Sequence, residues 1–314
     1  MTSFQAKKRQ IFQRLQRIFH SGRNAYALHY AIKHDALIEK ALNSSEMGVA
    51  SERLCGHEVV VSLTTYGRRL YDVAPTIESI MQGSLKPNRI VLWLGEDLRG
   101  TTLPVTLKKQ QKRGLEICYC EDIRSYKKLV PTLGKCPEAV IITIDDDAIY
   151  WYDTVERLVN EHCRFPDSII ANRVHRVKLG KNGRPLGYMD WDLKANPGED
   201  SALNFFTGVG GVLYPPHCLD PEVMNSDVFL DICKHADDIW FYAMALKAGT
   251  HVRKCPTHAL DGRDFIMNYE VQDSALKLVN TNMGSGSQKG RCENDVQFEA
   301  VFERYALWDK LREG

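Results

Sequence analysis

The sequence predicts an α/β fold with a mostly parallel central sheet, and three observations support this. Four short runs rich in Val, Ile and Leu are typical of buried strands, segments of helical periodicity separate them, and polar residues follow the strands. Strands that alternate with helices form parallel sheets with right-handed crossovers. The chain of 314 residues, 44% hydrophobic and 26% charged, is long enough for one large α/β domain with appendages or for two smaller domains.

The expected strands follow one another through the first half of the chain. They are EVVVSLTTYGRR, which ends in a polar turn (58–69), RIVLWL (89–94), LEICYC (115–120) and AVIITI (139–144). Helical periodicity is expected at 71–83, and a helix could begin within 125–133. In parallel sheets, ligands bind beyond the carboxyl ends of the strands, so the residues that follow these runs are the candidate site.

Three consecutive aspartates, Asp145, Asp146 and Asp147, directly follow the fourth strand. Neighbouring carboxylates repel one another and resist desolvation, so such a site needs a cation or raised pKa values. If the strand stays extended, Asp145 and Asp147 point to one side and Asp146 to the other. Two carboxylates on one side suit a hard divalent cation that keeps positions open for phosphate oxygens. The alternative is that Asp147 is the N-cap of a helix that begins in AIYWYDTVERLV (148–159).

A second acidic pair, Asp237 and Asp238, precedes an amphipathic helix that ends in Lys247 and Gly249. A carboxylate held near a reacting centre can act as a general base and take a proton from a hydroxyl group. The alternative is that both acids only cap the helix, whose N-terminus favours negative charge.

The first 23 residues carry six Lys and Arg residues and no acid, with apolar residues at helical spacing over residues 4–19. This predicts a basic amphipathic helix that lies on an anionic membrane surface or packs against the main domain or a partner. A second helix is expected at 25–42 and a polar linker at 43–56. We therefore expect a helical extension and linker at 1–50 and a catalytic domain at 51–314.

The cysteine pattern and the net charge indicate the redox environment of the protein and the kinds of partner that it binds. The nine cysteines form no CxxC pair and no regular framework, and there is no signal peptide or apolar run near 18 residues. These features predict a reduced, cytoplasmic protein. The net charge of +1 argues against nucleic-acid binding across the whole surface.

Five stretches in this order resemble bacterial nucleotide-sugar glycosyltransferases of the GT-A fold. The resemblance is nearest to the family-2-like enzymes that build capsule or lipopolysaccharide glycans, and it covers about residues 57–270. The stretches are VVVSLTTYGRRL, TIESIMQGSLKPNRIVLWL, SYKKLVPTLGKCPEAVIITIDDDAIY, FFTGVGGVLYPP and ADDIWFYAMALKAG. The resemblance implies a GT-A-like sheet and an inverting, metal-dependent transfer of a sugar from a nucleotide-sugar donor to a glycan or lipid-linked acceptor.

The resemblance also implies roles for the aspartate triplet. The segment Asp145–Asp147 would be the motif for the metal, Mn²⁺ or Mg²⁺, and the diphosphate, including a contact of Asp146 with the nucleotide-sugar. Asp147 would be a direct metal ligand, and Asp145 would reach the ribose or the metal. Many such enzymes add a later histidine to the metal site, for which His258 is the first candidate and His251 the second.

Further residues would bind the donor by the same analogy. Thr64, Tyr66 and Arg68 would border the nucleotide, and a cation at Lys127 or Lys128 could meet the base or a phosphate. The alternative for both lysines is a solvated helix face, which is favoured more for Lys128 than for Lys127.

A glycine-rich segment and the second acidic pair complete the expected site. Gly208, Gly210 and Gly211 allow the backbone to approach a ligand closely, and in the resembling enzymes the segment borders sugar and acceptor; a bulged strand is the alternative. The resembling enzymes carry Glu-Asp before this helix, with the second acid as catalytic base. That maps the base onto Asp238, but the departure at Asp237 leaves the choice between the two acids open.

Several other features predict structural roles. Two alternative functions also fit the sequence. Trp191 and Trp240 are expected in the core, Asn182-Gly183 indicates a hairpin turn, 282–295 is a linker or a lid, and Asn294 or Asp295 caps a final helix. A nucleotidyltransferase would use the triplet for metal-assisted attack on phosphorus. A non-catalytic binding protein would use both acidic groups only as helix caps.

Overall fold

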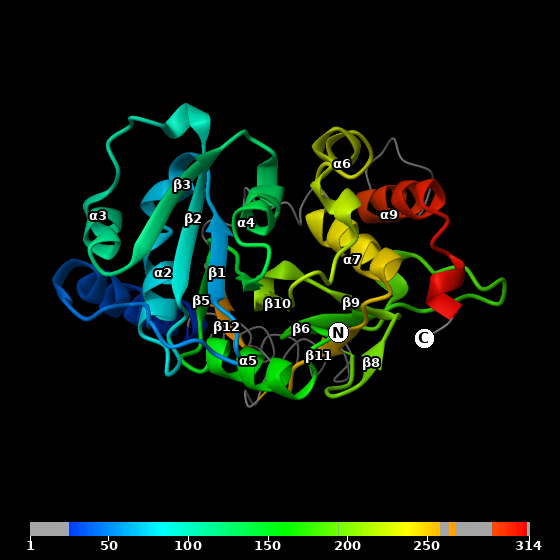
Figure 1. Cartoon of the computed structure of the whole chain (residues 1–314), viewed down its shortest axis with the longest axis horizontal. Helices are drawn as coiled ribbons and strands as arrows, with labels where there is room; N and C mark the ends of the chain where they lie inside the picture. Colours follow the sequence, from blue (N-terminus) through cyan, green and yellow to red (C-terminus); the bar gives the residue numbers. More distant parts are fainter. Residues whose placement is uncertain (1–24, 194, 258–263, 268–290, 313–314) are drawn as a thin grey trace, which may run out of the picture.

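A computed structural model describes residues 25–193, 195–257, 264–267 and 291–312 (Figure 1). Its centre is an eight-stranded sheet in the order β3 (Leu115–Cys120), β2 (Arg89–Gly95), β1 (Val59–Thr64), β4 (Val140–Thr143), β10 (Val212–Tyr214), β6 (Ile169–Ala171), β11 (Val252–Lys254), β8 (Asp200–Ser201). Strands β1 to β4 pair in parallel, and so do β6 and β11. Within this sheet, as far as the structure describes it, only β10 and β8 are antiparallel to their neighbours, so the predicted α/β class with a mostly parallel sheet is confirmed.

Two small two-stranded ribbons are separate from the central sheet. Strand β5 (Ala148–Tyr150) pairs with β12 (Phe265–Met267), and β7 (Val174–Arg176) pairs with β9 (Asn204–Phe206), both antiparallel. Because β5 follows the aspartate triplet at once, the turn that carries the triplet is held between two strands, β4 and β5.

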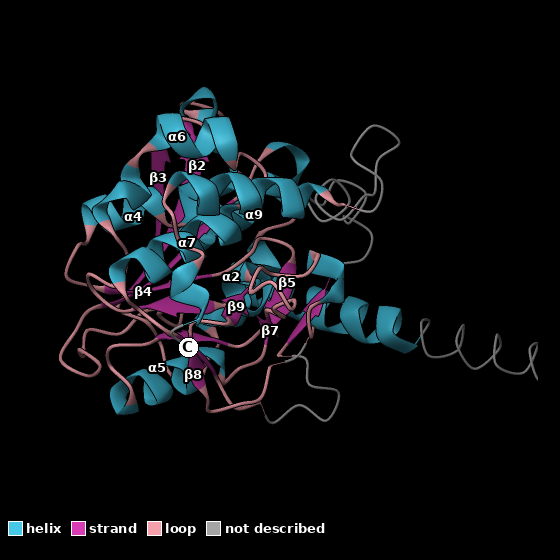
Figure 2. Ribbon diagram, turned by 90° about the vertical axis from the view of Figure 1, so that its right-hand side faces the viewer, coloured by secondary structure: helices cyan, strands magenta, loops and turns pink. Residues whose placement is uncertain are grey.

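Helices flank the sheet on both faces. They are a helix over residues 25–43, α2 (Ala74–Met81), α3 (Val105–Gln111), α4 (Val130–Lys135), α5 (Thr154–Arg164), α6 (Ser226–Ile232), α7 (Asp237–Ala248) and α9 (Glu293–Arg304). Short 3₁₀ turns link them: η1 (Gly67–Tyr71), η2 (Glu96–Leu98), η3 (Arg124–Lys128), η4 (Tyr188–Asp190), η5 (Gly208–Gly210), η6 (Pro221–Met224) and η8 (Asp309–Arg312). Figure 2 shows α7 and α9 side by side, beside β9.

Side chains of the central strands alternate between two apolar cores. In β1, Val60 packs into the core shared with α7 and α9, whereas Val61 packs into the core shared with α2. The same alternation separates Val91 from Leu92 in β2. This period of two is what an extended chain dictates, and it explains why these strands are apolar throughout.

Helix α7 is almost entirely buried, which fixes the acidic pair at its start. Residues Ile239 to Leu246 are all buried, and the helix ends at Gly249 with φ of 81°. Only glycine adopts this left-handed conformation without strain, so the predicted stop signal is confirmed. Because protein packs around almost the whole of α7, its first two residues, Asp237 and Asp238, are held in a fixed position beside the sheet.

Two expected helix starts are wrong. Asp147 caps no helix, because β5 follows it and α5 begins only at Thr154. The final helix is capped by Cys292 rather than by Asn294 or Asp295, because Asp295 lies at the third helical position and accepts the backbone N–H of Cys292 at 2.8 Å.

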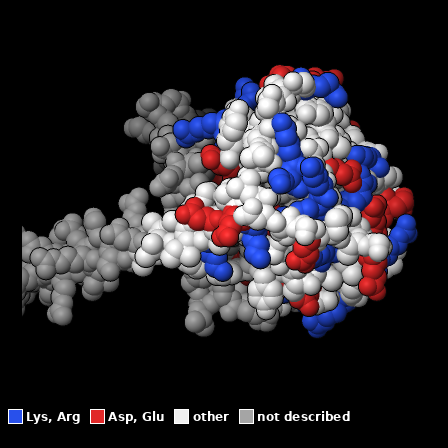
Figure 3. All heavy atoms as spheres, turned by 90° about the vertical axis from the view of Figure 1, so that its left-hand side faces the viewer, with Lys and Arg blue, Asp and Glu red and all other residues white. Residues whose placement is uncertain are grey.

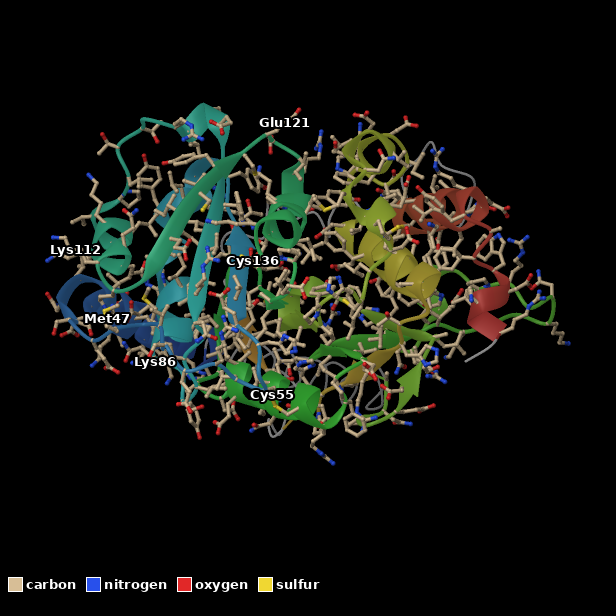
Figure 4. The ribbon with its side chains drawn as sticks, viewed as in Figure 1. Met47, Cys55, Lys86, Lys112, Glu121 and Cys136 are labelled. Atoms are coloured by element: carbon tan, nitrogen blue, oxygen red, sulfur yellow. A yellow bond between two sulfur atoms is a disulfide. The ribbon has the colours of Figure 1, made fainter. Side chains whose placement is uncertain are left out.

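The prediction of a fully reduced protein also fails. Cys55, which Figure 4 shows beside α5, forms a disulfide with Cys163 of that helix, 108 positions along the chain. No helix among the described residues is long and apolar enough to cross a membrane. Acidic and basic side chains are interspersed on the face shown in Figure 3. The expected basic helix at 4–19 and the expected lid or linker up to residue 290 lie outside the described residues.

Candidate functional site

Five segments far apart in the sequence converge beyond the carboxyl ends of β1 and β4. They carry Arg69 in η1, Lys128 at the end of η3, Asp145–Asp147 after β4, Gly208 at the start of η5 and Asp237–Asp238 at the start of α7. The five aspartates with Arg69 and Lys128 are called the acidic site below. The sequence predicted this location from strand ends alone.

Arg69 and Asp146 form the inner layer of the acidic site. Asp146 is 8% exposed; one of its oxygens accepts from Arg69 at 2.7 Å and the other from the Thr65 hydroxyl at 2.6 Å. Burial raises the pKa of Asp146, while Arg69 and Thr65 act in the opposite direction. Both oxygens of Asp146 thus accept hydrogen bonds from protein, which stabilises the turn, and the contact of Asp146 with a nucleotide-sugar stays a prediction.

The predicted alternation of the triplet is wrong. Asp146 and Asp147 both reach the Arg69 guanidinium, the latter at 3.4 Å, whereas Asp145 binds Lys128. The reason is that β4 ends at Thr143, so the aspartates lie in a turn where the side-chain alternation of a strand no longer holds.

Lys128 lies at the centre of the acidic site, although the sequence favoured Lys127. Its ammonium nitrogen is 3.0 Å from Asp145 Oδ1 and 2.9 Å from Asp237 Oδ2, and the side chain is buried. Burial alone would lower the pKa of Lys128, but the surrounding carboxylates raise it well above its usual value. Lys127 is also buried and pairs with Asp122, so neither lysine lies on a solvated face.

Gly208 is the point at which the two acidic segments meet. Its N–H is 3.1 Å from both carboxylate oxygens of Asp238. A Cβ atom built on Gly208 would lie 2.6 Å from Lys128 Nζ, 3.1 Å from Asp238 Oδ1 and 3.4 Å from Asp145 Oδ1. Any larger residue would therefore fill the space that the three charged groups share.

Asp238 differs from Asp237 in its surroundings. Burial, and next the charge of Asp237, raise the pKa of Asp238 to about 7, while Lys128 and the N–H of Gly208 act against this rise. Asp237 is held by Lys128 and by the Ser125 hydroxyl at 2.9 Å. Asp238 therefore combines partial exposure with a raised proton affinity.

The other two glycines pack against protein. A Cβ on Gly210 would lie 2.9 Å from Cβ of Arg173, and Gly211, with φ of +88°, lies beside Asn172. Asn172 donates to the carbonyl of Gly210 at 2.9 Å. These glycines let η5 approach the end of β6, and Gly208 is the glycine that faces the charged groups.

The residues predicted to border a nucleotide lie at the end of β1. Tyr66 is 53% exposed and Arg68 is exposed, so both are accessible to a ligand. The Thr64 hydroxyl donates to the carbonyl of Trp93 at 2.9 Å and joins the ends of β1 and β2.

The acidic site suits a divalent cation in its charge and donor type. Five carboxyl groups, two of them buried, face two basic groups, Arg69 and Lys128, and such an excess of acidic groups is balanced by raised pKa values or by a cation. Among the described residues, no group of three or more His, Cys, Asp or Glu side chains is arranged to hold a metal ion, so the predicted ligands Asp145 and Asp147 stay a prediction. His258 lies outside the described residues, and His251 precedes β11 at the opposite edge of the sheet.

Several supporting residues carried no clear sequence signal. Tyr150 accepts the N–H of Asp145 at 3.0 Å and donates to the carbonyl of Val209 at 2.9 Å, which ties the triplet to η5. For Arg69, the only sequence signal was its position at the end of TTYGRR, just after a predicted strand. Trp191 and Trp240 are buried, as predicted.

Comparisons with known proteins give limited information. No family model matches the chain, and no curated protein matches it. Among solved structures, the mannosyltransferase PcManGT of Pyrobaculum calidifontis in complex with GDP-Man and Mn²⁺ matches 76% of this chain and 63% of its own at 13% identity, with a TM-score of 0.39. S. aureus TarS 1–349 in complex with UDP matches 63% and 57% at 15% identity, TM-score 0.41.

A third match has a different activity in its name. The CMP:2-keto-3-deoxy-manno-octonic acid synthetase complexed with CTP matches 64% of this chain and 89% of its own at 14% identity, with a TM-score of 0.38. The chain spans less than two thirds of the length of the two preceding structures. At these scores the activity must be argued from the acidic site itself.

Proposed function

We propose that the protein is a metal-dependent glycosyltransferase that moves a sugar from a nucleotide-sugar donor to a glycan or lipid-linked acceptor in bacterial surface polysaccharide synthesis. One observation carries the proposal: Asp145 Oδ1 and Asp238 Oδ1 lie 3.4 Å and 3.1 Å from the position that a Cβ atom of Gly208 would occupy, so both carboxyl groups border the same small space beside Lys128. One carboxylate lies on the strand-end turn suited to a diphosphate, and the other has the proton affinity of a base.

On the donor side, Asp145 and Asp147 would hold Mn²⁺ or Mg²⁺ together with the diphosphate. A divalent cation bound there stabilises the negative charge of the departing nucleoside diphosphate. Lys128, 3.0 Å from Asp145, adds a fixed positive charge beside the same leaving group. The exposed Tyr66 and Arg68 would border the nucleotide.

On the acceptor side, Asp238 would take the proton of the attacking hydroxyl. The hydroxyl oxygen then forms a bond to the anomeric carbon as the bond to the diphosphate oxygen breaks, and the electron pair leaves with the diphosphate. Attack from the face opposite the leaving group inverts the anomeric configuration. A base with a pKa of about 7 is well suited to this step, because it is largely available near neutral pH and still accepts a proton.

The first test is thermal stability of the full chain with UDP, GDP, CDP, dTDP or CMP, each with and without Mn²⁺. A ligand that binds only the folded state raises its stability by mass action. We expect one nucleotide to stabilise the chain in a Mn²⁺-dependent way, to lose this effect in Asp145→Asn, and to keep it in Asp231→Asn on the exposed face of α6. Absence of any nucleotide effect on the wild type would contradict the proposal.

The products of turnover separate the proposed reaction from nucleotidyl transfer. A sugar transferase releases nucleoside diphosphate, whereas a nucleotidyltransferase releases pyrophosphate. Release of pyrophosphate from a nucleoside triphosphate would reassign the acidic site to attack on phosphorus.

A further inference from the structure

A basic group lies one residue away from the contact between Gly208 and Asp238. Arg173 follows β6, and its guanidinium donates to the hydroxyl of Thr207 at 2.9 Å. The N–H of Thr207 in turn donates to the carbonyl of Arg173 at 3.0 Å. Because Thr207 immediately precedes Gly208, these two bonds fix Arg173 next to the backbone that holds Asp238.

The positive charge of Arg173 is not matched by an acid. The side chain is half-buried, and it forms no ion pair with any carboxylate of the described residues. Arg176, on the same ribbon, is different: it binds Asn204 at 2.9 Å and Glu199 at 3.3 Å. A guanidinium has five N–H donors in a planar fork, so Arg173 keeps donors for an external anion.

Tyr188 packs its aromatic ring against the β7–β9 ribbon, whose first strand begins one residue after Arg173. Its ring lies 5.7 Å from that of His175 and 6.0 Å from that of Phe205, which face each other across the β7–β9 ribbon. Burial raises the pKa of Tyr188, Arg173 lowers it and Asp238 raises it further, so both charges act on this ring. A half-buried tyrosine offers an apolar face and a hydroxyl, a combination suited to a sugar ring.

We infer that Arg173, positioned by the buried Thr207, forms an acceptor subsite for an anionic group, bordered by Tyr188. The inference rests on the proposed function and specifies its acceptor. The acceptor would be a glycan that carries a phosphate or a carboxylate close to the hydroxyl that Asp238 deprotonates. Phosphate and carboxylate both fit the guanidinium fork in a bidentate way, whereas a neutral sugar would leave the Arg173 donors to water.

The test is calorimetric titration of the full chain with inorganic phosphate, glycerol 3-phosphate and glucuronate, with glycerol and glucose as uncharged counterparts. We expect the anions to bind more tightly than their uncharged counterparts. Arg173→Gln should weaken their binding by roughly tenfold or more, because charge-assisted hydrogen bonds are lost. Arg176→Gln, the matched control on the same ribbon, should leave it unchanged. Tighter binding of glycerol 3-phosphate or of glucuronate would identify the source of the charge.

Three results would overturn the inference: no anion binding by the wild type, unchanged binding in Arg173→Gln, or equal loss in Arg176→Gln. Equal loss in Arg176→Gln would indicate that the anions are attracted by positive charge in general and not by a specific subsite. Each titration is repeated with nucleoside diphosphate and Mn²⁺ present, so failure of donor binding, which contradicts the proposed function, is read separately from anion binding. If Arg173→Gln does not fold, Arg173→Lys and Thr207→Val replace it. Both substitutions should lower the affinity for the anions by a smaller factor. Unchanged affinity in both variants would also overturn the inference.

Discussion

At the scale of single residues, two neighbouring acids have different tasks. Asp237 is engaged by Lys128 and Ser125, whereas Asp238 meets only a backbone N–H among its hydrogen-bond donors in the described part of the chain. The resemblance favoured the second acid of the pair as the base, and the hydrogen bonds give an independent physical reason for the same choice. Under the proposed function, the same geometry favours Asp237 as a positioning residue.

Replacing Asp238 by Asn should abolish most turnover while donor binding remains. A general base contributes about 10²–10⁴-fold to rate, so we expect a loss in kcat of that size. The measurement is nucleoside diphosphate release, with the nucleotide-induced thermal shift measured on the same sample. Asp231→Asn on α6 is the control, and equal loss in both variants, or full activity in Asp238→Asn, would contradict the assignment.

The activity should fall on the acid side of neutral pH. The pKa of Asp238 is raised to about 7 in the folded protein, so the carboxylate becomes protonated, and unable to accept a proton, as pH falls through that value. A raised pKa also means that the stabilising contribution of this carboxyl to folding is complete below its unfolded pKa and is lost as pH rises through about 7.

The pH dependence of kcat/KM provides the measurement. One ionisation should appear on the acid limb near pH 7, and Lys128→Met should move it to higher pH because Lys128 lowers the pKa of Asp238. Lys128→Arg, which keeps a positive charge, is the control. An acid limb near pH 4 in the wild type would show that Asp238 is an ordinary carboxylate.

At the scale of elements, η5 brings backbone instead of a side chain to the acidic site. We expect Gly208→Ala to lower turnover strongly, because its Cβ would lie 2.6 Å from Lys128 Nζ and would displace that ammonium from Asp145. Gly134→Ala in α4 is the control, since its Cβ would make only an ordinary contact of 3.5 Å with Met224. Kinetics and thermal midpoints of both variants test this, and unchanged activity in Gly208→Ala would contradict a role for the close approach.

Long apolar runs were predictable from the sequence, and short strands were not. The run 115–120 matches β3 to the residue, because five of its six residues are apolar and Gly114 and Glu121 bound the run. Strands of two or three residues, such as β6, β8 and β10, are too short for a period of two to appear. Their place in the sheet comes from tertiary pairing.

The location of the acidic site was predictable, but its internal contacts were not. Strand ends placed the triplet and Thr64 to Arg68 on one edge, because parallel strands share that edge. The role of Lys128 depends on how η3 folds under β1, and no local pattern distinguishes it from Lys127. The disulfide of Cys55 joins positions 108 apart, a separation that spacing rules do not address.

At the scale of the whole molecule, one buried ion pair joins segments that no strand connects. Glu78 of α2, 0% exposed, accepts from Arg113 through both oxygens at 2.9 Å and from Gln110 at 3.0 Å. Arg113 also donates to the carbonyl of Glu46 at 2.6 Å. This cluster fixes α2, the end of α3 and the segment before β1, and it lies apart from the acidic site.

Arg113→Met should therefore destabilise the fold without changing the chemistry. Removing one partner of a buried ion pair costs about 3–5 kcal/mol in the free energy of unfolding, because Glu78 remains buried without its counter-charge. Denaturant unfolding measures the effect. The exposed bidentate pair Arg99–Glu96 provides the control, since Arg99→Met should change stability little in solvent. If the two variants lost equal stability, burial of the ion pair would not be the cause of the loss. If the nucleotide-dependent shift disappeared in Arg113→Met, the ion pair would not be independent of the acidic site.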